Sequence, residues 1–120
     1  MSEKNPVNFK LAVVGNANSI LLYRAFGVES FAAASSDECQ KKVEELFFLL
    51  QNDEKKNPQF AVIFVEDEFY KNFSEDLLEK FARRALPAVV PVPSSGRNKN
   101  FAKNRLRKIV ERAVGSDILN

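Results

Sequence analysis

The feature that most constrains the fold is an alternation of short apolar runs with longer segments of helical periodicity. Runs rich in Val, Ala and Phe are typical of buried strands, whereas apolar residues three or four apart are typical of amphipathic helices. The strand-like runs are 9–15, 28–33, 60–65 and 88–92, and the helix-like segments are 20–26, 36–51, 66–86 and 101–114. This alternation predicts an α/β fold, a small doubly wound sheet of four parallel strands with helices on both faces, as in Rossmann-like and flavodoxin-like domains, closed by a basic C-terminal helix.

Local signals refine the expected element boundaries. Small hydroxyl and acidic residues favour helix starts, and Gly favours a left-handed helix end. Proline inside a strand favours a sheet edge, because it lacks an N–H group. We therefore expect Ser19 to cap the first helix and Gly27 to end it, Ser36 or Asp37 to cap the second helix, and Pro91 to lie in an edge strand. The segment 66–86 is compatible with one helix or with a restart at Ser74.

The length and composition indicate one compact domain. A chain of 120 residues with 45% apolar content can bury a sufficient core without disulfides or metal. We expect a single domain over 1–120, with a core of about 8–115 and frayed ends at 1–7 and 116–120. No apolar run approaches the roughly 20 residues of a membrane span, and the start MSEKNPVNFK lacks a signal-peptide apolar region. The expected location is cytoplasmic, without direct membrane insertion.

The near absence of His and Cys excludes several reaction classes. The chain has no His and one Cys, so it lacks the residues of Ser-His-Asp and Cys-His catalysis and of zinc sites built on His or paired Cys. We expect no catalytic residues, no cofactor and no metal. Cys39 shares the helical stripe of Val43, Leu46, Phe47 and Leu50, which predicts a buried core thiol.

An anion site is one alternative function for this fold. Ligands of doubly wound sheets bind beyond the carboxyl ends of the strands. The first such loop, GNANS, lacks the glycine spacing of a dinucleotide site and the Lys of a phosphate loop. Polar residues of several loops would nevertheless meet at this end and could hold an anion or phosphate: Asn16, Ser19, Ser94, Ser95, Arg97 and Lys99.

A receiver-like signalling domain is a related alternative with the same element order. Its chemistry requires acidic residues after the first strand, where this chain has Asn16 and Asn18. Asp67 and Glu68 follow the third strand, but carboxylates in the first turn of a helix are also favoured by the helix dipole. The dipole interpretation explains them without a phosphorylation site.

The C-terminal segment is strongly basic. Residues 97–120 carry seven basic and two acidic side chains, whereas residues 1–96 carry eleven and fourteen. The basic side chains Lys103, Arg105, Arg107, Lys108 and Arg112 share one amphipathic segment with Glu111 as its acid. No aromatic residue is interleaved with them to stack bases, so we expect a negatively charged protein partner and no nucleic acid.

The order of motifs resembles the F subunits of V-type and A-type rotary ATPases. The family begins with a strand and a Gly-Asp-x-Asp-Thr turn, matched by KLAVVGNANSILLYRAFGV, and continues with an apolar strand that runs into an acidic helix start, matched by FAVIFVEDEF. A Pro-Ala-x-x-x-x-Pro-Ser strand and a basic helix closed by Gly-x-Asp follow. Their counterparts here are Pro87, Ala88, Pro93 and Ser94, then Gly115 and Asp117.

This resemblance implies a non-catalytic component of the central stalk, which forms part of the rotor. Its expected partner is the coiled-coil D subunit of the stalk, with further contacts to the rotor-capping subunit and, through the C-terminal helix, to the catalytic A/B ring. Its role would be to support proton or sodium ion transport coupled to ATP. The residues that the resemblance assigns to the partner contact are Arg105, Leu106, Ile109, Val110, Arg112 and Ala113.

Overall fold

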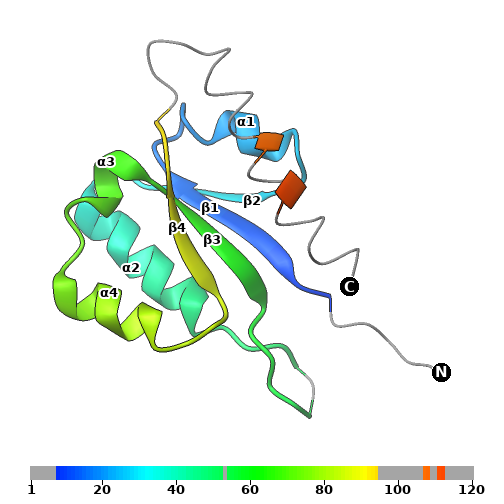
Figure 1. Cartoon of the computed structure of the whole chain (residues 1–120). Helices are drawn as coiled ribbons and strands as arrows, with labels where there is room; N and C mark the ends of the chain where they lie inside the picture. The colour runs from blue at the N-terminus through cyan, green and yellow to red at the C-terminus, as the bar shows by residue number, and fades with distance from the viewer. Residues whose placement is uncertain (1–7, 53, 95–106, 109–110, 113–120) are drawn as a thin grey trace.

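A parallel sheet of four strands lies at the centre of the molecule, in the order β2-β1-β3-β4 (Figure 1). The computed structural model describes residues 8–52, 54–94, 107–108 and 111–112. The strands are β1 (Lys10–Gly15), β2 (Glu29–Ala32), β3 (Phe60–Glu66) and β4 (Ala88–Val92). The predicted α/β fold with a parallel sheet of four strands is confirmed, and β4, which contains Pro91, is an edge strand as expected.

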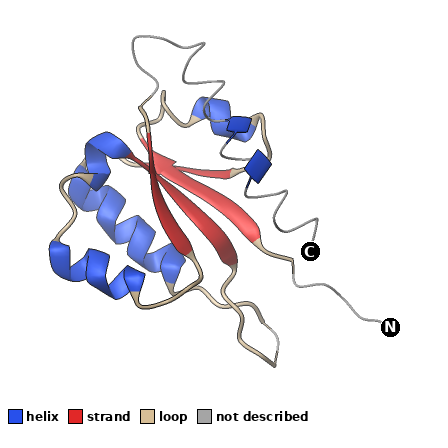
Figure 2. Cartoon of the chain, viewed as in Figure 1, coloured by secondary structure: helices blue, strands red, loops and turns tan. Residues whose placement is uncertain are grey.

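Helices cover both faces of this sheet (Figure 2). They are α1 (Leu21–Arg24), α2 (Ser36–Phe47), α3 (Asp67–Tyr70) and α4 (Glu75–Ala82). Successive strand residues point to opposite faces. Val14 is accordingly buried in a cluster with Phe47 of α2 and Phe81 of α4, whereas its neighbour Val13 is buried in a second cluster with Tyr23 of α1.

Helix α2 begins and ends earlier than the sequence predicts. Its N-cap is Ser35, whose hydroxyl accepts a hydrogen bond from the Glu38 N–H at 3.2 Å, so the expectation of Ser36 or Asp37 was wrong. The helix ends at Phe47 and does not reach position 51. The chain instead turns back, and Leu50 forms an antiparallel bridge with Pro58.

The first helix also departs from expectation at its start. Ile20 occupies the N-cap position of α1 without a side-chain hydrogen bond, so Ser19 does not cap it. The Ser19 hydroxyl donates instead to Glu66. Gly27 has a φ of 78°, which confirms its left-handed conformation, but α1 ends earlier than expected, at Arg24, and Gly27 lies in the turn that follows.

The long segment after β3 forms two helices. Glu66 belongs to the strand, α3 is a single turn, and α4 restarts with Ser74 as N-cap. The Ser74 hydroxyl accepts a hydrogen bond from the Leu77 N–H at 3.2 Å. The restart at Ser74, one of the two alternatives for this segment, is therefore confirmed.

Only part of the basic C-terminal segment belongs to the described residues. Arg107, Lys108, Glu111 and Arg112 are helical and exposed, and the rest of the expected helix 101–114 lies outside the described residues. Within the described residues, no helix is long and apolar enough to cross a membrane. The extent of the domain and of its frayed ends stays a prediction.

Candidate functional site

The carboxyl ends of β1 and β3 form the topological switch point of the sheet. The chain leaves β1 toward β2 on one side, whereas β3 lies on the other side of β1. Ligand sites of doubly wound folds occupy this position. The loop after β1 and the start of α3 are therefore the first places to examine.

Glu66 occupies this switch point. It is the last residue of β3, and only 7% of its surface is exposed. One carboxylate oxygen, Oε1, accepts a hydrogen bond from the Asn16 backbone N–H at 2.7 Å. The other, Oε2, accepts one from the Ser19 hydroxyl at 3.3 Å. Through these two hydrogen bonds Glu66 ties the β1 loop to the end of β3.

The close approach of Glu66 explains the glycine at position 15. A Cβ atom on Gly15 would lie 2.9 Å from Glu66 Oε1 and 3.2 Å from a methyl group of Ile20. A side chain here would therefore displace the carboxylate from its hydrogen bonds. Sequence analysis missed Glu66, which is the first of three consecutive acidic residues after the apolar run FAVIFV.

Two neutral titratable groups lie within the electrostatic reach of Glu66. Burial, and secondarily the Glu66 carboxylate, raises the pKa of the Cys39 thiol to about 12. Burial, followed by Glu66 and Asp67, raises the pKa of the Tyr23 hydroxyl well above its usual range. Both groups therefore stay protonated near neutral pH, and neither is an activated nucleophile.

Cys39 is buried with no exposed surface, which confirms the predicted core thiol. We expect iodoacetamide at about pH 8 to leave Cys39 unmodified in the native protein and to alkylate it in denaturant, because the thiolate is the reactive form. Mass spectrometry would follow the alkylation. Rapid modification of native protein would contradict this expectation.

Because the pKa of the Cys39 thiol is higher in the folded than in the unfolded protein, raising the pH above about 9 should also lower the free energy of unfolding.

The residues of the predicted anion site interact with carboxylates. Ser19 donates to Glu66, and the Ser94 hydroxyl donates to Asp67 Oδ1 at 2.9 Å. Asn16 forms a local turn in which its side chain accepts the Asn18 N–H at 3.0 Å. The other candidates, Ser95, Arg97 and Lys99, lie outside the described residues. The two carboxylates give this end of the described structure a negative charge, which opposes anion binding.

Signs of a receiver or metal site are also missing from the described part of the chain. Asp67 and Glu68 lie in the first turn of α3, as the helix-dipole interpretation predicts. No group of three or more acidic or thiol side chains among the described residues could hold a metal ion. What the described structure shows at the switch point are the hydrogen bonds that Glu66 accepts from the β1 loop.

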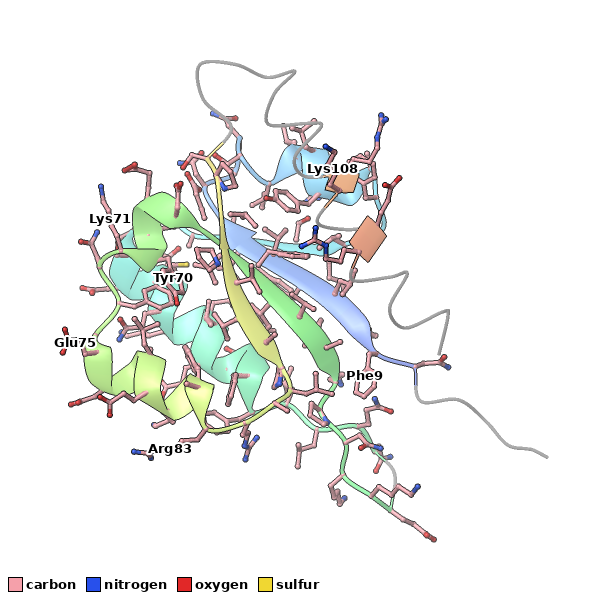
Figure 3. All side chains as sticks on the ribbon, viewed as in Figure 1. Phe9, Tyr70, Lys71, Glu75, Arg83 and Lys108 are labelled. Atoms are coloured by element: carbon pink, nitrogen blue, oxygen red, sulfur yellow. The ribbon has the colours of Figure 1, made fainter. Side chains whose placement is uncertain are left out.

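The predicted partner-contact residues are only partly described. Arg112 is helical and exposed, as are its neighbours Arg107 and Lys108, the last of which is labelled in Figure 3. The remaining candidates lie outside the described residues: Arg105, Leu106, Ile109, Val110 and Ala113. The exposed basic side chains are those that the amphipathic pattern places on the polar face of this segment.

Comparison with known proteins identifies the family. The family model described as ATP synthase (F/14-kDa) subunit matches residues 11–110. The chain belongs to this family. The match includes all of β2, β3 and β4 and most of β1. It also reaches into the basic C-terminal segment.

Individual relatives agree with this assignment. The chain is 34% identical to the V-type ATP synthase F subunit of Clostridium perfringens over 92% of this chain and 95% of the relative. It is 28% identical to the V-type ATP synthase F subunit of Fusobacterium nucleatum over 92% of this chain and 96% of the relative. A crystal structure of the V-type ATP synthase F subunit from Archaeoglobus fulgidus shares the fold. It has a TM-score of 0.56 and 22% identity, and the match covers 72% of this chain and 99% of that chain.

The family match makes this chain a subunit of an ATP synthase complex. The relatives that match include F subunits of V-type and A-type ATP synthases. Partners of the chain therefore lie within that complex. The functional surface to look for is one that contacts proteins.

Proposed function

We propose that the chain is a non-catalytic rotor component of the central stalk, which binds the coiled-coil D subunit. In this role it would lie on the cytoplasmic side, peripheral to the membrane, and support ATP-coupled transport of protons or sodium ions. The resemblance in the sequence to stalk F subunits suggests this partner, and the family match supports the assignment of the chain to such a complex.

The observation that carries the proposal is the basic amphipathic C-terminal segment. Its apolar stripe includes Leu106, Ile109, Val110 and Ala113, and its polar face is basic. Apolar residues at the centre of an interface supply most of the affinity, while charges at the rim guide association and set the register. A segment of this kind suits a coiled coil with acidic side chains along its surface. Further contacts to the rotor-capping subunit and the A/B ring would follow from the same placement.

The double substitution Leu106→Asp and Val110→Asp tests the proposed contact. We expect it to weaken binding to the cognate D subunit by at least about tenfold, because it places charges in the apolar centre of the interface. Isothermal titration calorimetry would give the affinity, and circular dichroism would verify the fold. The matched control is Leu21→Asp, at a side chain of α1 that is 58% exposed. Unchanged affinity in the folded double variant would rule out this helix as the interface.

The basic face makes a separate kinetic prediction. Replacing Arg105, Arg107 and Lys108 with Gln should slow association with the D subunit at low salt and have little effect at high salt, because salt screens exposed charges. Stopped-flow fluorescence at two ionic strengths would measure the association rates. Equal rates for the natural protein at both ionic strengths would contradict electrostatic steering.

A further inference from the structure

An exposed apolar surface lies at the opposite end of the sheet from Glu66. Here the C-terminal ends of α2 and α4 meet near the start of β4 (Figure 1). Four large apolar side chains in this region are between 37% and 44% exposed: Phe48, Leu49, Leu50 and Leu86. Clustered apolar exposure of this kind is typical of a binding surface.

Basic side chains border these apolar residues. The Arg84 guanidinium lies 5.2 Å from the centre of the Phe48 ring, and the Lys80 ammonium lies 5.7 Å from it. Arg83, which is exposed, projects from the same end of α4 (Figure 3). Lys80 pairs with Glu44 at 3.4 Å, but among the described residues neither Arg83 nor Arg84 forms an ion pair. We call these apolar and basic residues together the Phe48 surface. Its members are Phe48, Leu49, Leu50, Lys80, Arg83, Arg84 and Leu86.

A pocket adjoins the Phe48 surface. It has a volume of about 240 Å³ and lies between α4 and the start of β4. Apolar side chains line much of it, including Leu78, Phe81 and Val89, and Arg84 also contributes to its wall. Arg84 thus lies between this pocket and the exposed Phe48 ring. A buried apolar anchor next to an Arg is typical of the residues that dominate binding energy at interfaces.

The backbone beside this surface is already paired. The Gln51 N–H donates to the Asn57 carbonyl at 2.6 Å, and the Gln59 N–H donates to the Leu49 carbonyl at 3.0 Å. A partner strand would therefore find these donors occupied, which argues against binding by strand addition here. Recognition must come from side chains, as when an amphipathic helix lays its apolar face against a surface.

We propose that the Phe48 surface docks an acidic amphipathic α-helix of a partner protein. Apolar side chains of that helix cover Phe48 and Leu50 and enter the adjoining pocket, while its carboxylates pair with Arg83 and Arg84. Bidentate pairing with a carboxylate suits the planar guanidinium group. The proposal concerns a surface separate from the C-terminal helix and does not depend on binding to the D subunit. A second copy of this chain is a poor occupant, because the two Arg pairs would face one another in a symmetric dimer.

A pair of synthetic helical peptides tests this proposal on the full chain. Both carry Leu at positions i, i+3, i+4 and i+7, and the flanking positions hold Glu in one peptide and Lys in the other. We expect the Glu peptide to bind in fluorescence anisotropy and to shift the NMR amide signals of residues 48–50 and 80–86. The Lys peptide should bind at least about tenfold more weakly, because its charges meet Arg83 and Arg84.

Two variants separate the parts of the surface. Arg84→Gln and Phe48→Ser should each weaken binding of the Glu peptide about tenfold while circular dichroism stays unchanged. The double variant Leu106→Asp and Val110→Asp should bind this peptide as the natural protein does, which separates this test from that of the stalk contact. Equal binding of both peptides, or shifts centred on other residues, would overturn the proposal. Two other results would also overturn it. One is a dimer, detected by light scattering, that Phe48→Ser abolishes. The other is that vesicles of phosphatidylglycerol shift the same NMR signals whereas the Glu peptide does not.

Discussion

Phe47→Ala is expected to lower the free energy of unfolding by about 3–5 kcal/mol, the usual cost of truncating a buried Phe. Phe47 has no exposed surface and lies at the C-terminal end of α2. The centre of its ring lies 4.6 Å from the centre of the Phe81 ring. This contact joins α2 to α4 in the larger core cluster. Because domains of this size are stable by only about 5–15 kcal/mol, the loss should be easy to measure by urea denaturation.

The adjacent residue provides a matched control. Phe48 is 42% exposed, so Phe48→Ala removes the same atoms from a position that is only half covered. We expect it to cost less than about 1 kcal/mol, since little apolar surface is lost from the core. Similar losses at the two positions would mean that α2 does not place Phe47 in the core and Phe48 on the surface.

Glu66→Ala is expected to lower the free energy of unfolding by about 1–3 kcal/mol, because the Asn16 N–H and the Ser19 hydroxyl lose their shared acceptor. Glu66→Gln keeps the shape and one carbonyl oxygen, so it should cost less than Glu66→Ala. The same urea titration would rank the three proteins. A glutamine variant less stable than the alanine variant would show that shape and hydrogen bonding at this site matter less than proposed.

Gly15 and Glu66 should be coupled. Gly15→Ala alone is expected to destabilise the protein by about 1–3 kcal/mol, because the new Cβ would lie 2.9 Å from the Glu66 carboxylate. In a Glu66→Ala background the contact with Oε1 is gone, while those with the Cβ of residue 66 at 3.0 Å and with a methyl group of Ile20 at 3.2 Å remain, so the loss in the double variant should be smaller than the sum of the two single losses. Strict additivity in this double-mutant cycle would contradict the close packing of the switch point.

The features that sequence analysis predicted correctly depend on local pattern. Cys39 was placed in the core by its position on an apolar helical stripe, and Gly27 was placed in a left-handed turn by its own conformational freedom. Pro91 indicated an edge strand because it lacks an N–H group. Each of these signals acts within a few residues of the position that it describes.

The features that were missed depend on partners distant in the sequence. Ser19 follows the usual pattern of a helix cap, but its hydroxyl donates a hydrogen bond to Glu66, 47 positions away. Helix α2 ends early because Leu50 pairs with Pro58 across a turn. No periodicity within α2 carries that information. The Phe48 surface was likewise missed, since Phe48 and Arg84 come together only when α2 and α4 pack side by side.

The most direct test of the proposed function is size-exclusion chromatography with light scattering on the full chain, alone and mixed with its cognate coiled-coil D subunit. The proposal predicts that the chain alone elutes as a monomer and that the mixture gives a stable one-to-one complex. A chain that stays monomeric in the presence of the D subunit would contradict the assignment to the central stalk. Phosphate and nucleotide would then be screened for a rise in melting temperature, because a ligand that binds the native state raises it.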